Sequence, residues 1–212
     1  KMQRDPVAQK KMLETMRRIA RYRSERLPQY LLTHPETENR LEYVSSLIET
    51  NKDEQKSHGQ RDNFRFLRFK YRILAASKDT TALRTSLATT LSDSKSSKEE
   101  ILLAKFGLAE VEKNDSNFDK SRKLLDEVIA GYPDKQILKT DKGVLELTAG
   151  RVAEAKKLLE ESVAADKNDL LAVYTLGKVY MSMNDMKKAE QLFLAVKTEI
   201  PEYAKVYFEL GK

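Results

Sequence analysis

The feature of this 212-residue sequence that most constrains its fold is a repeat with a period of 34 residues. Gly143 and Gly177 are 34 positions apart, as are Gly177 and Gly211, and Ala155 and Ala189 keep the same interval. A fixed period of this length indicates stacked units of supersecondary structure rather than one globular core. Small residues at fixed positions allow two antiparallel helices to approach closely. With only 7 Gly and 5 Pro, and with 34% charged residues, the composition also favours helices, so we expect an all-α helical solenoid.

The order of residue types within one period narrows the kind of repeat. Residues 170–203 place small and large apolar residues in a fixed order that ends in a proline: Leu176, Gly177, Tyr180, Ala189, Phe193 and Pro201. This order resembles a tetratricopeptide repeat, which is a pair of antiparallel helices. The same period gives units at residues 102–135, 136–169 and 170–203, and a partial unit at 204–212. The resemblance implies a superhelix whose groove, lined by the first helix of each unit, binds a polypeptide.

The period also predicts which side chains line that groove. They occupy first-helix positions on the side expected to face inward: Phe106, Glu110, Val144, Leu147, Tyr174, Lys178, Met181, Lys205 and Phe208. Aromatic, aliphatic and lysine side chains suit an extended or helical polypeptide better than a small metabolite. We therefore expect a protein partner, either a substrate or a component of an assembly machinery.

Residues 63–101 follow the period only weakly, and we interpret them as a degenerate first repeat that caps the solenoid. Their first helix carries an apolar stripe, and beside it basic residues recur at helical spacing: Arg61, Arg65, Arg68 and Arg72. One interpretation is a buried stripe with a solvated basic edge. The other is that these arginines dock an acidic partner or a neighbouring domain.

The N-terminal part contains a motif of a different kind, YLLTHPETENRL at residues 30–41. Thr33 and Glu36 form a capping-box signature and Pro35 suits a first helical turn, so local chemistry alone explains a helix start here. The motif also resembles a segment late in the catalytic domain of the zinc metallopeptidases that include HtpX and the CAAX prenyl endopeptidase. A domain ending in this way and followed by tetratricopeptide repeats is the layout of the BepA-type periplasmic proteases.

This resemblance implies that residues 1–55 are the last helices of a protease domain and that the polar residues 56–62 are a linker. In that family a loop histidine lies over the active site, so His34 would be a fourth zinc ligand; the alternative is a structural role at the helix start. Arg40 would dock on the catalytic domain. The zinc-binding His-Glu-x-x-His motif would lie upstream of Lys1, and its setting would be periplasmic quality control and assembly of outer-membrane proteins.

The chain itself offers no catalytic constellation. It has no Cys, and neither of its two histidines, His34 and His58, begins a His-Glu-x-x-His motif. Glycine loops for nucleotides and the nucleophile elbow of hydrolases are also missing from the sequence. We therefore expect no enzyme activity and no cofactor in this chain, with zinc only in a parent protein.

The charge distribution leaves a second functional hypothesis open. Residues 1–75 hold 17 Lys and Arg against 10 Asp and Glu, which accounts for the basic net charge of +6. The alternative to the protease assignment is thus a free-standing repeat scaffold whose basic first third docks on an anionic membrane or nucleic acid. Under the protease assignment no nucleic-acid partner is expected, whereas peripheral membrane contact is compatible with it.

Overall fold

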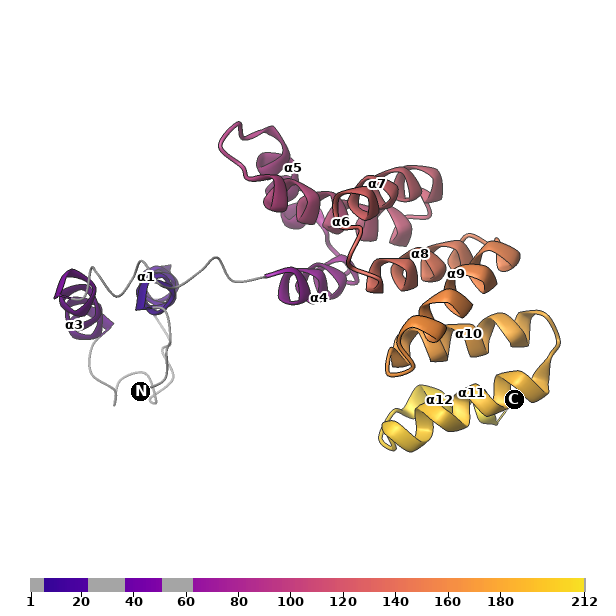
Figure 1. Ribbon diagram of the computed structural model, residues 1–212. Helices are drawn as coiled ribbons and strands as arrows, with labels where there is room; N and C mark the ends of the chain where they lie inside the picture. The colour runs from indigo at the N-terminus through magenta and orange to yellow at the C-terminus, as the bar shows by residue number, and fades with distance from the viewer. Residues whose placement is uncertain (1–5, 23–36, 51–62, 212) are drawn as a thin grey trace. The chain divides into compact units, whose positions relative to one another are not determined.

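The computed structural model describes residues 6–22, 37–50 and 63–211, which form eleven α-helices and no β-strand (Figure 1). This confirms the all-α class predicted from the sequence. The chain divides into two compact units, residues 1–62 and residues 63–212. Within the described ranges no helix combines the length and the apolar character that crossing a bilayer requires.

The first unit contains a pair of helices, α1 (Pro6–Tyr22) and α3 (Thr37–Thr50). Proline is tolerated at the first position of α1, because the N–H group that it lacks would have no partner within the helix. The two helices pack through Leu13, Leu41 and Val44, which are buried. Since His34 and the rest of the Thr-His-Pro loop lie outside the described residues, the zinc-ligand prediction remains a prediction.

The second unit is built around three helical hairpins that stack on one another (Figure 1). The pairs are α6 (Lys98–Asn114) with α7 (Phe118–Gly131), α8 (Ile137–Thr148) with α9 (Val152–Ala165), and α10 (Leu170–Ser182) with α11 (Met186–Glu199). The short helix α12 (Ala204–Leu210) packs against α11. This arrangement confirms the predicted helical solenoid.

The reversal inside each hairpin uses one geometry three times, at intervals of 34 residues. Ser116, Gly150 and Asn184 have φ values of 63°, 77° and 62°, in the left-handed region that ends many helices. The residue after each one donates its backbone N–H to the carbonyl five residues earlier, as Asp185 does to Tyr180 at 2.9 Å. This bond satisfies one of the carbonyl groups left open at the helix end.

Two glycines of the repeat are required because the helices of a hairpin lie very close together. A Cβ atom on Gly143 would lie 2.6 Å from Cγ of Leu159, and one on Gly177 would lie 2.6 Å from Cε1 of Phe193. The large side chain of the second helix thus fills the space that the missing Cβ leaves. This is the physical reason for the spacing of these glycines.

The first two helices of this unit depart from the hairpin pattern. The helices α4 (Phe64–Ala75) and α5 (Thr81–Ser92) both pack against α6, but they contact each other at most marginally. Figure 1 shows them diverging from α6 in different directions. Residues 63–92 therefore do not form a closed helical pair of the kind seen three times downstream.

Candidate functional site

The candidate site is the side of the solenoid formed by the first helices of the repeats, α6, α8, α10 and α12, and we call it the first-helix face. At its N-terminal end this face is covered by α4. Phe106 on α6 is completely buried in a cluster that includes Phe64, and Leu67 and Tyr71 pack against the same cluster. Glu110, one turn further along α6, is 5% exposed. The expectation that Phe106 and Glu110 line an open groove is therefore wrong, because α4 occupies the space in front of them.

A buried ion pair connects α4 to α8. Nε and Nη2 of Arg68 each donate a hydrogen bond to one carboxylate oxygen of Asp141, both at 2.6 Å. Burial acts to lower the pKa of Arg68, but the charge and hydrogen bonds of Asp141 raise it above its ordinary value. Burial also raises the pKa of Asp141, and the guanidinium group of Arg68 opposes this rise. The bidentate geometry fixes α4 in both position and orientation.

The second inward arginine of α4 joins the same network. Nη1 of Arg72 lies 3.5 Å from Asp141, and its Nε lies 3.9 Å from Glu110, which also accepts a hydrogen bond from Lys113 at 2.7 Å. Arg68 and Arg72 thus bind carboxylates of their own unit, which is a different role from docking an external partner.

The other predicted docking residues are placed differently. Arg65 is exposed on α4, and Arg40 is partly exposed on α3. Arg61 lies outside the described residues. Arg65 lines the same pocket as Arg68, whereas Arg40 belongs to the other compact unit.

Both ends of α4 are anchored as well. The ring of Phe64 packs edge-on against Tyr132 with centroids 5.1 Å apart, and Nζ of Lys135 lies 5.4 Å above the same ring. At the other end, the side-chain amide of Asn114 donates a hydrogen bond to the carbonyl of Ala75 at 2.7 Å. Helix α4 is therefore held along its whole length against α6 and the α7–α8 turn.

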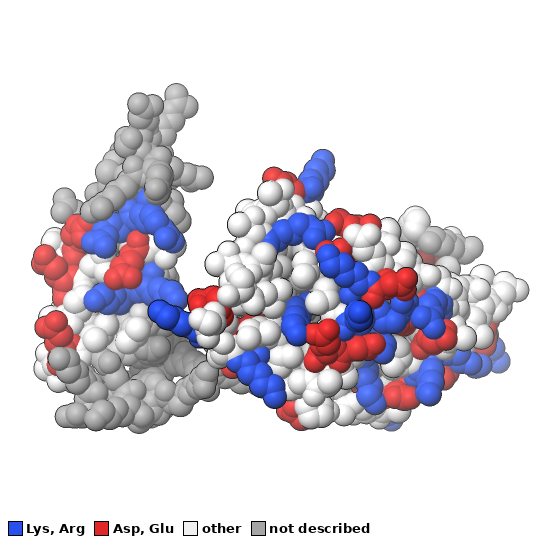
Figure 2. All heavy atoms as spheres, turned by 90° about the horizontal axis from the view of Figure 1, so that it is seen from above, with Lys and Arg blue, Asp and Glu red and all other residues white. Residues whose placement is uncertain are grey.

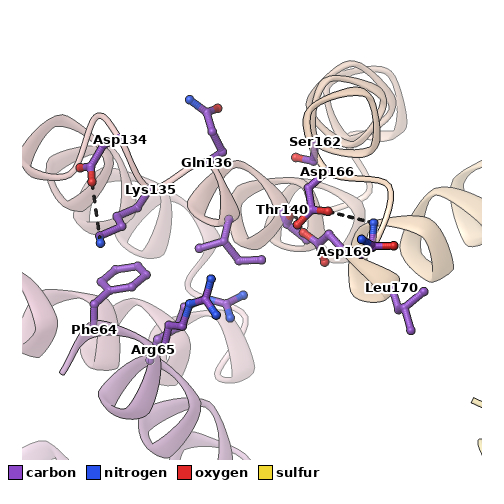
Figure 3. Close-up of a pocket in the computed structure, with 13 residues that line it drawn as sticks. Phe64, Arg65, Asp134, Lys135, Gln136, Thr140, Ser162, Asp166, Asp169 and Leu170 are labelled. Atoms are coloured by element: carbon purple, nitrogen blue, oxygen red, sulfur yellow. Dashed lines mark hydrogen bonds and ion pairs between the residues drawn. The ribbon is translucent and has the colours of Figure 1, made fainter. Parts of the chain in front are cut away.

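Beyond the start of α4 the surface opens into a pocket of about 620 Å³ (Figure 3). Figure 3 shows Arg65 and Lys135 on one side of this pocket and Thr140, Asp166 and Asp169 on the other. The hydroxyl of Thr140 donates to Asp169 at 2.6 Å, and the same carboxylate caps the N-terminus of α10. Asp134 lies beside Lys135, 3.7 Å from its Nζ, so the pocket offers groups of both signs.

The first-helix face continues on α10 and α12. Tyr174, Lys178 and Met181 follow one another at helical spacing along one side of α10, and Lys178 is exposed. The hydroxyl of Tyr174 donates to Glu209 at 3.3 Å, and its ring packs against Tyr203. Burial and the charge of Glu209 raise the pKa of Tyr174 to about 12, so its hydroxyl is a neutral donor near pH 7.

The remaining predicted groove residues lie on α8 and α12, the first helices before and after α10. Lys205 and Phe208 are exposed on α12, and 67% of Phe208 is accessible to solvent. Val144 and Leu147 are partly buried on α8. Apolar surface and ammonium groups therefore alternate along the part of the face that α4 leaves open.

Two buried glutamates were missed at the sequence level. Glu112 accepts hydrogen bonds from Arg84, Lys120 and Asn117, each at 2.8 Å. Burial acts to raise its pKa, but these donors together lower it to about 2. Glu146, 34 residues later, accepts two bonds from Arg122 at 2.7 and 2.9 Å. Their common spacing was the signal that could have revealed them.

These glutamates are structural rather than catalytic. Each links the first helix of one hairpin to the helix before it, and both are occupied by cations of the solenoid itself. On the face of residues 63–211 that Figure 2 shows, basic and acidic side chains are interspersed. Among the described residues, no group of three or more His, Cys, Asp or Glu side chains could hold a metal ion.

Comparison with known proteins agrees with this architecture. Two models of the tetratricopeptide-repeat family match the chain, one over residues 105–169 and the other over residues 146–211. A search of curated proteins returns no match. Together the matched ranges run from residue 105 within α6 to residue 211, just past the end of α12. The chain is therefore a protein that contains tetratricopeptide repeats.

Proposed function

We propose that this chain is a protein-interaction module that binds a polypeptide segment on the first-helix face from α8 to α12. The observation that carries the proposal is the composition of this surface, where Tyr174 and Met181 supply apolar contact and Lys178 supplies an exposed ammonium group. Lys205 adds a second exposed ammonium group on α12. A segment that combines apolar and acidic side chains would match this pattern.

The closure of the N-terminal end by α4 limits where such a segment can lie. Because Phe106 and Glu110 are buried, contacts are confined to α8, α10, α12 and the pocket beside Arg65. The pocket would receive a polar side chain or a chain terminus of the partner, since it offers both basic and acidic groups. A bound segment would thus run from this pocket toward α12.

The test is a peptide selection followed by affinity measurements. Peptides are selected from a random library on the intact chain, and the best binder is labelled and titrated against variants by fluorescence anisotropy. Lys178→Glu reverses one charge on the first-helix face, and Lys187→Glu makes the same change at an exposed position of α11. We expect the first variant to weaken binding by about tenfold or more and the control to leave it unchanged. Equal affinities for both variants would place the binding site elsewhere.

We further propose that the module belongs to a zinc metallopeptidase of the periplasm that acts in quality control and assembly of outer-membrane proteins. This rests on the motif at residues 30–41 and on the presence of repeats after it. Zinc would be held by residues other than the described ones, with His34 as an additional ligand. The interaction module would then present substrates or recruit an assembly machinery.

Two measurements test this finer proposal. The reading frame upstream of Lys1 should encode a His-Glu-x-x-His motif and a later glutamate, and a frame without them would refute the assignment. If the motif is there, the purified full-length protein should contain zinc, and His34→Ala should change its peptidase activity. Unchanged zinc content and activity would remove the ligand role of His34 and leave it as a helix-start residue.

A further inference from the structure

Helix α4 has two apolar faces, and only one of them is used within the solenoid. The inner face contacts α6, α8 and the α7–α8 turn through the residues described above. The outer face exposes a second set of large apolar side chains: Phe66 (65% exposed), Phe69 (63%) and Ile73 (55%). An apolar cluster of this size on one helix indicates an interaction surface rather than scattered exposure.

The charged side chains that border this outer face are all positive. At about 100° per residue, Phe69, Ile73 and Phe66 fall within an arc of roughly 60° on the helix surface. By the same geometry Arg65 lies on one edge of this arc and Lys70 on the other, and both are exposed. Helix α4 contains no Asp or Glu. The outer face is therefore an apolar stripe bordered by cations on both sides.

The inner arginines of α4 differ from the outer cations in their partners. Arg68 and Arg72 are neutralised by Asp141 and Glu110 inside the solenoid. Arg65 and Lys70 are both exposed, and Arg65 also lines the pocket beside the start of α4. The helix is also rigid before it meets a partner, because the inner bonds already fix its orientation. A binding event at the outer face therefore needs no ordering of α4.

We propose that the outer face of α4 docks on an anionic lipid surface. The phenylalanine and isoleucine side chains would enter the boundary between headgroups and acyl chains, and the flanking cations would contact anionic headgroups. The outer side chains are either hydrocarbons or flexible cations, and they include no amide or hydroxyl group. Such a set suits a fluid surface better than a protein partner, whose interface would require fixed hydrogen bonds.

The absence of Trp from the sequence allows a direct test. Phe66→Trp places a single fluorophore on the outer face, and Leu194→Trp places one at an exposed position of α11 as the control. Both variants are mixed with phosphatidylcholine vesicles, with or without about one third phosphatidylglycerol. For the first variant we expect a blue shift and quenching by brominated acyl chains, only with the anionic vesicles, and reversal at high salt. The control should show neither change.

Substitutions separate the two parts of the surface. In vesicle flotation, Phe66→Ser with Phe69→Ser should lower binding by about tenfold or more, and so should Arg65→Gln with Lys70→Gln. Lys123→Gln with Lys187→Gln removes the same charge at exposed positions of α7 and α11 and should leave binding unchanged. Circular dichroism verifies that each variant is folded.

Three results would overturn the proposal. The first is no binding to anionic vesicles, which would leave the face as a protein interface. The second is equal binding to neutral and anionic vesicles, which would remove the role of Arg65 and Lys70. The third is binding that survives both double substitutions on α4, which would place the lipid contact elsewhere. None of these results depends on the peptide-binding function of the first-helix face.

Discussion

The bond between Arg68 and Asp141 offers the most quantitative test of how α4 is held. The two donors of Arg68 lie 2.6 Å from the carboxylate oxygens, and the side chains of Arg68 and Asp141 are 14% and 1% exposed. Removing one partner of a buried pair leaves the other charge uncompensated, at a cost of about 3 to 5 kcal/mol. Arg68→Met and Asp141→Leu should therefore each lower the free energy of unfolding by about 3 kcal/mol.

The double variant distinguishes this explanation from a simple loss of packing. With both charges replaced by apolar side chains, no uncompensated charge remains, and the double variant should be about as stable as the wild type or differ by roughly 1 to 2 kcal/mol. The double-mutant cycle should thus give a coupling energy of about 3 kcal/mol or more. If the two substitutions acted independently, the double variant would lose the sum of the two single losses in unfolding free energy.

Urea unfolding followed by circular dichroism at the helix band measures these differences. With a slope of about 2 kcal/mol per molar urea, each single variant should shift the midpoint by roughly 1.5 M. Arg65→Met is the matched control, since Arg65 is exposed on the same helix, and it should change stability by less than about 0.5 kcal/mol. Additive losses in the double variant, or a control as damaging as Arg68→Met, would refute the reasoning.

Glu112 and Gly177 give two further predictions about the stability of the repeats. Glu112 has a pKa of about 2 against an ordinary 4.5, so its stabilising contribution is present above about pH 4.5 and is lost as the pH falls toward 2; in acid titrations of the unfolding free energy, Glu112→Gln should flatten this dependence. A Cβ on Gly177 would lie 2.6 Å from Phe193, whereas one on Gly211 would meet no atom closer than 3.4 Å. Gly177→Ala should therefore lower the free energy of unfolding by about 1 to 3 kcal/mol, measured by urea unfolding, and an equal effect of Gly211→Ala would contradict the packing argument.

The sequence predicts the repeating part of the fold well because the same physical requirement recurs every 34 residues. Gly150 and Asn184 are spaced by the period, and glycine and asparagine tolerate the positive φ that both adopt, so their sequence is typical of a turn. Ser116 occupies the same turn with φ of 63°. Serine carries no such preference, so only the period could have indicated it.

Helix α4 shows where a single sequence is insufficient. Its residues FRFLRFKYRILA place apolar side chains on both sides of the helix, so periodicity alone does not tell which side is buried. The structure buries Phe64 and Ala75 and exposes Phe66 and Phe69. The choice depends on tertiary contacts with α6 and α8, which no local pattern contains.

The period assigns equivalent positions in successive repeats, but it does not tell which of these positions are exposed. Phe106 has the same position in its repeat as Tyr174, yet Phe106 is completely buried and Tyr174 is partly exposed. The difference arises because α4 packs against α6, whereas no described helix covers α10 in the same way. Glu112 and Glu146 were missed because carboxylates on helices are usually solvated, whereas these two are buried.

The measurement that tests the central proposal most directly is thiol protection by a bound peptide. The chain has no Cys, so Lys178→Cys and Lys187→Cys each introduce one exposed thiol, the first on the first-helix face and the second on α11. The rate of reaction with a maleimide is measured with and without a saturating amount of the selected peptide. We expect the peptide to slow the reaction at position 178 and to leave the reaction at position 187 unchanged. Protection at 187 with none at 178 would contradict it.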